Sequence, residues 1–226
     1  MPLTHPVVLA LPFTERWLVQ NSPARRVPSH GTDLFGGRYA TDFVGVDERR
    51  RTAGERDWGT LFGTEPPERF FAFGRPILAP ADGVVVAVHD GEPDHEARRS
   101  QLALVGYMLG QAQRARRGVG AIAGNHVIIA LRDGSAFVAL VHLRKGSLRV
   151  AVGDAVTTGQ QVGSCGNSGN STQPHVHVQV MDGPDPSVAR GVPMAFRNYR
   201  EWPAAGVGPR TVESGIPGEG AVVEPL

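Results

Sequence analysis

Frequent glycine and proline divide the sequence into short runs in which valine and other apolar residues alternate with polar ones. The 226 residues include 29 Gly and 18 Pro, a composition that favours many short strands joined by turns over a helical bundle. Strand-like runs lie at 7–20, 39–46, 76–89, 125–131, 136–143 and 175–181. We therefore predict a mainly β protein with many short strands.

Residues 96–117 have a different periodicity from the rest of the chain. Apolar residues recur there at spacings of three and four, at Leu102, Val105, Leu109 and Ala112. This spacing places them on one face of a helix, so we predict one inserted helix at about 96–117. Its ends are basic. We interpret it either as a solvated helix that covers one side of the sheet or as a lip of the functional site that attracts an anionic polymer.

The other segments indicate one domain with additions. Residues 47–75 and 90–124 are longer than simple connections between strands, and we interpret them as insertions in a single domain at 1–202. Residues 203–226 are rich in Pro and Gly, and we expect a loosely ordered tail there.

Charge and cysteine content exclude several classes of function. The net charge is only +1, so no general attraction to nucleic acid is expected. No apolar run is long enough for a membrane span. Cys165 is the only cysteine, so a metal site must use His, Asp or Glu. Residues 1–12 lack a positively charged region, and we expect no secretory signal peptide.

Two histidines lie two residues apart in the strand predicted at 175–181. Residues two apart in a strand point to the same face, with Cα atoms about 6.8 Å apart for a rise of roughly 3.4 Å per residue. His175 and His177 therefore project side by side from one surface. This arrangement allows one imidazole to bind a metal while the other faces a substrate beside it.

Three further residues are candidates for the same site. His30 lies in a Gly-rich loop, and loops often carry functional groups. Asp42 lies in an otherwise apolar strand, where an ionised carboxylate requires a partner or a metal. His142 has apolar neighbours on both sides and also requires a partner. A hydrolytic zinc site typically has three protein ligands and an open position for water, and other histidines can act there as acid and base.

The candidate residues belong to a longer pattern of segments. In chain order these are His30, Tyr39-Ala40-Thr41-Asp42-Phe43, Ala81-Asp82-Gly83-Val84-Val85, Val141-His142-Leu143, Gly146-Ser147-Leu148, Gly166-Asn167-Ser168-Gly169-Asn170-Ser171 and Pro174-His175-Val176-His177. Together, over residues 10 to 200, they resemble the lysostaphin-type (LytM, M23) zinc metallopeptidases.

The resemblance implies a fold, a reaction and a role for each residue. The implied fold is an antiparallel β-sheet or β-sandwich with a groove. The implied zinc ligands are His30, Asp42 and His177, while His142 and His175 are the implied catalytic histidines that activate water and stabilise the oxyanion. The implied reaction is hydrolysis of peptide bonds in bacterial peptidoglycan cross-links or interpeptides, which places the protein in the cell envelope or outside the cell.

The spacing of the acidic ligand departs from the commonest family pattern, in which the Asp follows the His by four residues. Asp33 follows His30 by three residues, and Asp42 follows it by twelve. We expect Asp42 to be the ligand, because its strand can hold it rigidly and its Tyr-Ala-x-Asp-Phe context resembles a longer-spaced variant. Asp33 is the alternative.

Other functions compete with a peptidase. The same fold can serve as a catalytically inactive binding or regulatory module that acts on a cell-wall enzyme or another partner protein. A biotinyl or lipoyl carrier domain would need a modified lysine, and Lys145, the only lysine, lacks the expected neighbours. Cys165 could act as a thiol nucleophile served by His175, although a buried structural cysteine is the commoner case. His126 could border the groove.

Overall fold

The computed structural model describes residues 5–54, 63–98, 119–134, 136–205 and 208–226. The short helices in these ranges are η1 (Leu34–Tyr39), η2 (Pro67–Arg69) and α4 (Val119–Ala123). The strands are β1 (Val7–Ala10), β2 (Trp17–Gln20), β3 (Thr41–Gly45), β4 (Pro76–Leu78), β5 (Gly83–His89), β6 (Asn125–Leu131), β7 (Phe137–Leu143), β8 (Ala155–Val156), β9 (Gln161–Ser164), β10 (Val176–Met181), β11 (Met194–Trp202), β12 (Arg210–Gly215) and β13 (Val222–Pro225).

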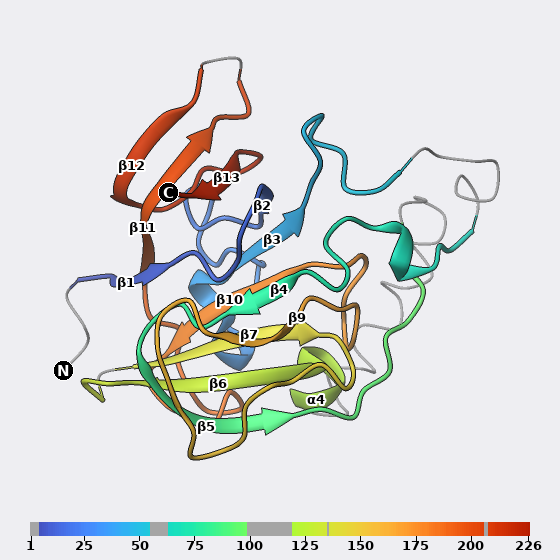
Figure 1. Ribbon diagram of the computed structural model, residues 1–226. Coiled ribbons are helices and arrows are strands. Elements are labelled where there is room, and N and C mark those ends of the chain that lie inside the picture. The colour runs from blue at the N-terminus through green and yellow to red at the C-terminus, as the bar shows by residue number, and fades with distance from the viewer. Residues whose placement is uncertain (1–4, 55–62, 99–118, 135, 206–207) are drawn as a thin grey trace.

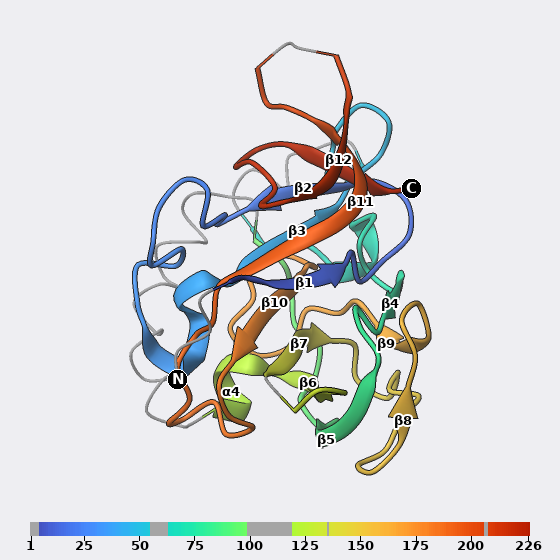
Figure 2. The same cartoon turned by 90° about the vertical axis from the view of Figure 1, so that its left-hand side faces the viewer.

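Most of the described strands form one twisted sheet (Figure 1). Its order is β1-β11-β13-β2-β3-β10-β7-β6-β5-β8, with β12 paired to β11, while β4 and β9 form a second small sheet. Apart from the parallel β1–β11 pair, the paired strands run antiparallel. Figure 2 shows β10, β7 and β6 side by side, with α4 next to them. The predicted mainly β, antiparallel fold is confirmed.

The two faces of the central strands differ because side chains alternate along a strand. In β10, Val176, Val178 and Val180 are buried in the main hydrophobic core, whereas His177 and Gln179 point to the opposite face and line a cavity. In β3, Phe43 likewise enters the core while Asp42 lines that cavity. The alternation along each strand therefore places the apolar residues in the core and the polar candidate residues in the cavity.

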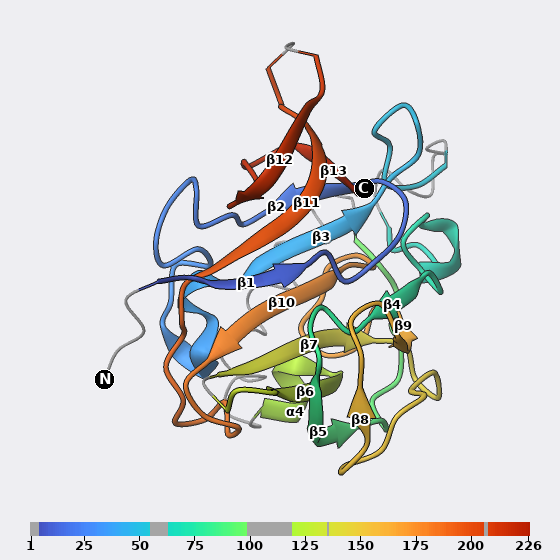
Figure 3. The ribbon, with the colours of Figure 1, turned by 60° about the vertical axis from the view of Figure 1, so that its left-hand side comes forward.

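An aromatic cluster in the core holds the strand that carries Asp42. The Phe13 ring stacks on Trp17 with centroids 4.7 Å apart and contacts Phe43 edge-on at 5.0 Å. Phe43 also contacts Phe196 of β11 at 5.3 Å. Such rings contribute large buried apolar areas, so β2, β3 and β11 are fixed together directly behind the site. Figure 3 shows these strands crossing the upper half of the molecule.

The expectation of a loosely ordered tail at 203–226 is wrong for the residues that the structure describes there. They form β12 and β13, which both pair with β11, and β13 also pairs with β2. Val222 and Val223 are buried, and the Glu201 carboxylate accepts hydrogen bonds from Arg210 and from the Gly218 backbone. Most of the described glycines and prolines of this segment lie outside the strands, of which β13 is partly buried and β12 is mostly exposed.

The predicted helix at 96–117 lies mostly outside the described residues. Its first described residues are not helical, because Ala97 forms an antiparallel bridge with Glu65. The structure describes a short helix, α4, over Val119–Ala123. No helix in the described ranges is long and apolar enough to cross a membrane.

Burial of the last strand gives a direct test of its structural role. We expect Val223→Asp to lower the free energy of unfolding by at least about 3 kcal/mol, because it places an unpaired charge in the core. The matched control is Val188→Asp at a side chain that is 79% exposed, where a change within about 0.5 kcal/mol is expected. Urea denaturation measures both. Equal stability of the two variants would contradict the packing of β13.

Candidate metal and catalytic site

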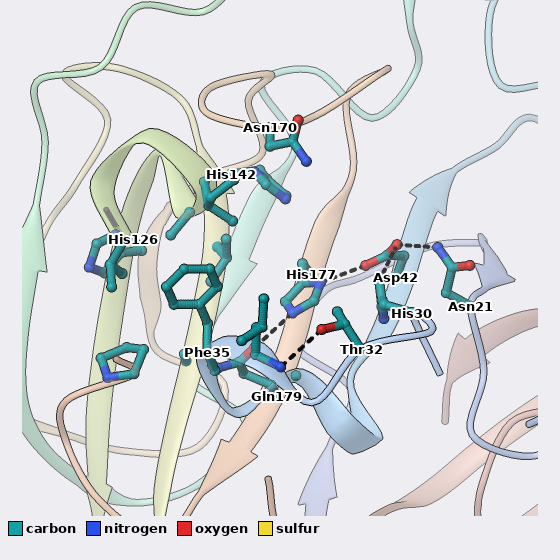
Figure 4. A pocket seen from close by; sticks show the side chains of 18 of the residues that line it. Asn21, His30, Thr32, Phe35, Asp42, His126, His142, Asn170, His177 and Gln179 are labelled. Carbon is teal, nitrogen blue, oxygen red and sulfur yellow. Dashed lines mark hydrogen bonds and ion pairs between the residues drawn. The ribbon is translucent and has the colours of Figure 1, made fainter. Parts of the chain in front are cut away.

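Strand pairing brings Asp42 and His177 together from distant parts of the sequence. The two residues are directly opposite each other in the antiparallel β3–β10 pair, and both point to the cavity face (Figure 4). His30 reaches the same place from the loop between β2 and η1. One donor atom from each of the three residues lies within 4.8 Å of the others. The sheet thus assembles two imidazoles and one carboxylate in a single cluster.

The Asp42 carboxylate is the centre of this cluster. Its Oδ2 lies 3.0 Å from His30 Nε2 and accepts a hydrogen bond from Asn21 Nδ2 at 2.8 Å. Its Oδ1 lies 2.8 Å from His177 Nδ1 and 3.7 Å from His175 Nε2. Four polar side chains therefore converge on the two oxygens of this buried acid.

Charge coupling keeps the Asp42 carboxyl group ionised. Burial by itself raises its pKa, but the charges of His30 and His175 and the hydrogen bonds from His177 and His30 lower the pKa well below its usual value. Burial lowers the pKa of His30, and the Asp42 carboxylate outweighs this effect and raises it. The Asp42 carboxylate is therefore an ionised oxygen donor at the centre of the cluster.

Gln179 determines which nitrogen of His177 carries a proton. The Gln179 Nε2 amide donates to the Phe35 carbonyl at 2.7 Å, so Gln179 Oε1 is the atom that faces His177 Nε2 at 2.9 Å. His177 Nε2 therefore donates, and in the neutral ring the lone pair on Nδ1 faces Asp42 Oδ1. A lone pair that faces an ionised oxygen is unfavourable unless a cation, either a proton on Nδ1 or a metal ion, lies between the two atoms. These residues fit a divalent metal such as zinc, which takes imidazole and carboxylate donors.

A β-bulge carries His142 into the same cavity. Along β7, Val138 and Leu140 enter the core, so strict alternation would place His142 on that side. The β6–β7 register shifts here, and Val141 and His142 together oppose one residue of β6. His142 has a φ of 65°, which is rare outside glycine. The bulge re-aims its side chain toward the cavity.

Backbone carbonyls orient both candidate catalytic histidines. His142 Nδ1 donates to the Ser168 carbonyl at 2.9 Å, and His175 Nδ1 donates to the Gln173 carbonyl at 2.8 Å. These bonds leave Nε2 of each ring as the nitrogen able to accept a proton. The ring centroids are 4.6 Å apart.

Burial lowers the pKa of both rings. The pKa of His142 lies well below its ordinary value, and the charges of His175 and His177 add to the effect of burial. For His175, burial also lowers the pKa, although the Asp42 carboxylate opposes the shift. These shifts favour the neutral form of both rings, which is the form that can accept a proton.

The remaining sequence candidates lie elsewhere or play other parts. Asp33 is exposed and its carboxylate pairs with Arg38 at 2.7 Å, apart from the three-residue cluster. Cys165 is buried in the main core and burial raises the pKa of its thiol, so it is not available as a nucleophile. His126 does line the cavity, at the end away from Asp42.

Sequence reasoning missed Gln179 and Asn21, although both bond to cluster residues. Gln179 follows His177 by two residues and therefore shares its face, which is a signal that strand periodicity could have supplied. Asn21 has no such local signal, because its contact with Asp42 depends on the β2–β3 pairing.

The profile of peptidase family M23 matches residues 69–189, more than half of the chain. The chain belongs to peptidase family M23. The match includes His142, His175 and His177, whereas His30 and Asp42 precede it. A comparison with curated proteins gives no match.

Three solved structures illustrate the similarity of this M23 chain to known folds. The catalytic domain of the antimicrobial peptidase lysostaphin from Staphylococcus simulans is 19% identical, with a TM-score of 0.40 over 79% of this chain and 88% of that one. A mutant catalytic domain of the prophage-encoded M23 protein EnpA from Enterococcus faecalis is 23% identical, with a TM-score of 0.36 over 63% and 94%. LytU is 21% identical, with a TM-score of 0.34 over 65% and 86%.

Metal binding tests the role of Gln179 in fixing the tautomer of His177. We expect Gln179→Leu to weaken zinc affinity by about 10–100-fold, because His177 loses the acceptor that keeps its Nδ1 free for a metal. The control is Gln160→Leu at an exposed glutamine whose side-chain oxygen accepts from the nearby Thr157 backbone N–H. This variant should bind zinc as the wild type does. Competition with a chromophoric chelator measures both affinities. An unchanged zinc affinity in Gln179→Leu would show that Gln179 does not orient His177.

Proposed function

We propose that the chain is a zinc-dependent endopeptidase that hydrolyses peptide bonds in bacterial peptidoglycan cross-links or interpeptides. The observation that carries the proposal is the meeting, in one cavity, of a three-donor cluster with two buried histidines whose Nε2 atoms are free to accept a proton. Membership of peptidase family M23 supports the same reaction class. The proposed substrate implies a place of action in the cell envelope or outside the cell.

The three donors of the cluster would hold the metal. His177 offers Nδ1, Asp42 offers its carboxylate, and His30 offers the imidazole nitrogen that faces Asp42. When bound, zinc supplies Lewis-acid chemistry, which makes water a better nucleophile and polarises a carbonyl oxygen. The Asn21 amide and the Gln179 side chain keep Asp42 and His177 in place for this role.

The two other histidines supply proton transfer. The Nε2 atom of His175 lies beside the cluster, 3.7 Å from Asp42 Oδ1, and the His142 ring is next to it. One Nε2 accepts a proton as the water oxygen bonds to the carbonyl carbon, and that proton then passes to the leaving nitrogen as the C–N bond breaks. The second imidazole takes up a proton from solvent on its Nε2 and then donates a hydrogen bond to the negative oxygen. The backbone acceptors of both Nδ1–H groups hold the rings in the required orientation.

Substitution should separate metal binding from catalysis. We expect Asp42→Ala and His177→Ala to lose zinc and activity together, since each removes a donor from the cluster. Zinc per chain after dialysis, measured by elemental analysis, should fall from close to one in the wild type to close to zero. His5→Ala, at an exposed histidine outside the cavity, is the control and should retain the metal. Full zinc content in Asp42→Ala would assign the metal to other residues.

The catalytic pair should behave differently from the donors. We expect His142→Ala and His175→Ala to retain zinc but to lose about 10²–10⁴ in kcat, the usual contribution of acid–base groups. Release of soluble peptides from purified peptidoglycan measures the rate. Full activity in either variant would overturn its role. A wild-type protein that holds zinc and cleaves no peptidoglycan or peptide would instead indicate a catalytically inactive binding module.

A further inference from the structure

The cavity that contains the donor cluster extends well beyond it. Its volume is about 310 Å³, and it runs from Asp42 on β3 across β10, β7 and β6 to α4. Alternation along these strands determines which side chains face it, since every second residue points to this side of the sheet. The donor cluster occupies one end, so most of the cavity is available to a bound peptide.

The end over β6 and β7 is apolar. Ile128, Ala139 and Val141 form its floor and belong to a small hydrophobic cluster separate from the main core. The side chains of Ile122 and Ala123 on α4 form a wall. This surface adjoins the catalytic histidines directly, because Val141 precedes His142 in the bulge.

Phe35 adds an aromatic side to this end of the cavity. Its backbone has a φ of 57°, and its carbonyl is held by the Gln179 amide at 2.7 Å. The following Gly36 packs so closely on Met181 that a Cβ there would lie 2.7 Å from Met181 Cγ. The loop is therefore fixed, and Figure 4 shows the Phe35 side chain pointing into the cavity.

Charged groups are scarce around the apolar end. Among the described residues that line the cavity, Asp42 is the only acid and there is no Lys or Arg. His126, at the far end, donates from Nδ1 to the Gly124 carbonyl, and burial lowers its pKa. A charged substrate side chain placed here would lose water without gaining an ionic partner, whereas an apolar side chain would gain by burial.

We propose that this apolar end is the subsite for an uncharged apolar side chain on the substrate residue next to the scissile bond. The inference rests on the proposed endopeptidase function and specifies its substrate class. A substrate with only glycine around the scissile bond would leave the floor of Ile128, Ala139 and Val141 uncovered. The enzyme therefore selects peptides in which an aliphatic residue adjoins the bond that is cut.

Binding tests the subsite without requiring hydrolysis. The probes are Gly-Gly-X-Gly-Gly peptides, with X as Leu, Gly or Glu, in which both amides that flank X are replaced by methylene-amine groups. Calorimetric titration into the zinc-reconstituted full chain should give an affinity about 10-fold higher for Leu than for Gly, the scale of a hydrophobic pocket contact, and the weakest binding for Glu. Equal affinities for Leu and Gly would overturn the proposal.

Variants of the α4 wall identify where the preference arises. Ala123→Phe fills the subsite and should reduce the Leu-over-Gly affinity ratio to about one, while affinity for the Gly probe stays within about threefold. Ile122→Asp should weaken binding of the Leu probe about 10-fold or more, and Ile122→Val is its matched control with near wild-type binding. A full Leu preference in Ala123→Phe would place the apolar contact elsewhere and contradict the assignment.

Hydrolysis of the corresponding all-amide peptides distinguishes this inference from the proposed function. Cleavage of the Leu peptide with a kcat/KM about 10-fold above that of the Gly peptide supports both. Leu-selective binding without cleavage of any peptide would overturn the endopeptidase function while supporting the subsite. Cleavage with equal kcat/KM for Leu and Gly would support the endopeptidase and reject the subsite.

Discussion

The buried carboxylate of Asp42 is the constraint on which the site depends. An ionised acid at 6% exposure is costly unless positive charge and hydrogen-bond donors surround it. His30, His177 and Asn21 provide them, and each comes from a different segment of the chain. The pairing registers of β2 with β3 and of β3 with β10 are what bring these groups together. A shift of either register by one residue would turn Asp42 or its partners to the opposite face.

The aromatic core and the donor cluster therefore lie on opposite faces of the same strands. Phe43 cannot leave the core without moving Asp42, because they are neighbours on opposite faces of β3. On β10 the same relation links Val176 and Val178 to His177. Packing behind the sheet holds the donors at the front, and a rigid sheet is a better support for a metal centre than a loop.

The features that depend on local signals could be predicted from the residues themselves, whereas those that depend on distant partners were either implied only by the family resemblance or missed. Alternating valines located β10 and His177 on it. The final strands were mistaken for a tail because the Gly and Pro of the turns dominate their composition, while burial of Val223 depends on pairing with β2 and β11. His30 contacts Asp42 from a loop, and no periodic sequence pattern predicts that contact. The direction of His142 follows from a bulge that breaks the strand period.

That bulge also explains how one sheet face can be both reactive and apolar. Without it, β7 would present only Ala139 and Val141 to the cavity, and His142 would be buried among core valines. One extra residue in β7 adds an imidazole beside the donor cluster while leaving the apolar floor intact. The left-handed backbone of His142 is an unfavourable conformation confined to this position of the strand, and the hydrogen bond from its ring to the Ser168 carbonyl helps to hold it. Local strain at one residue therefore places a proton acceptor at the boundary between the polar and apolar ends of the cavity, where a scissile bond and the side chain next to it would both be in reach.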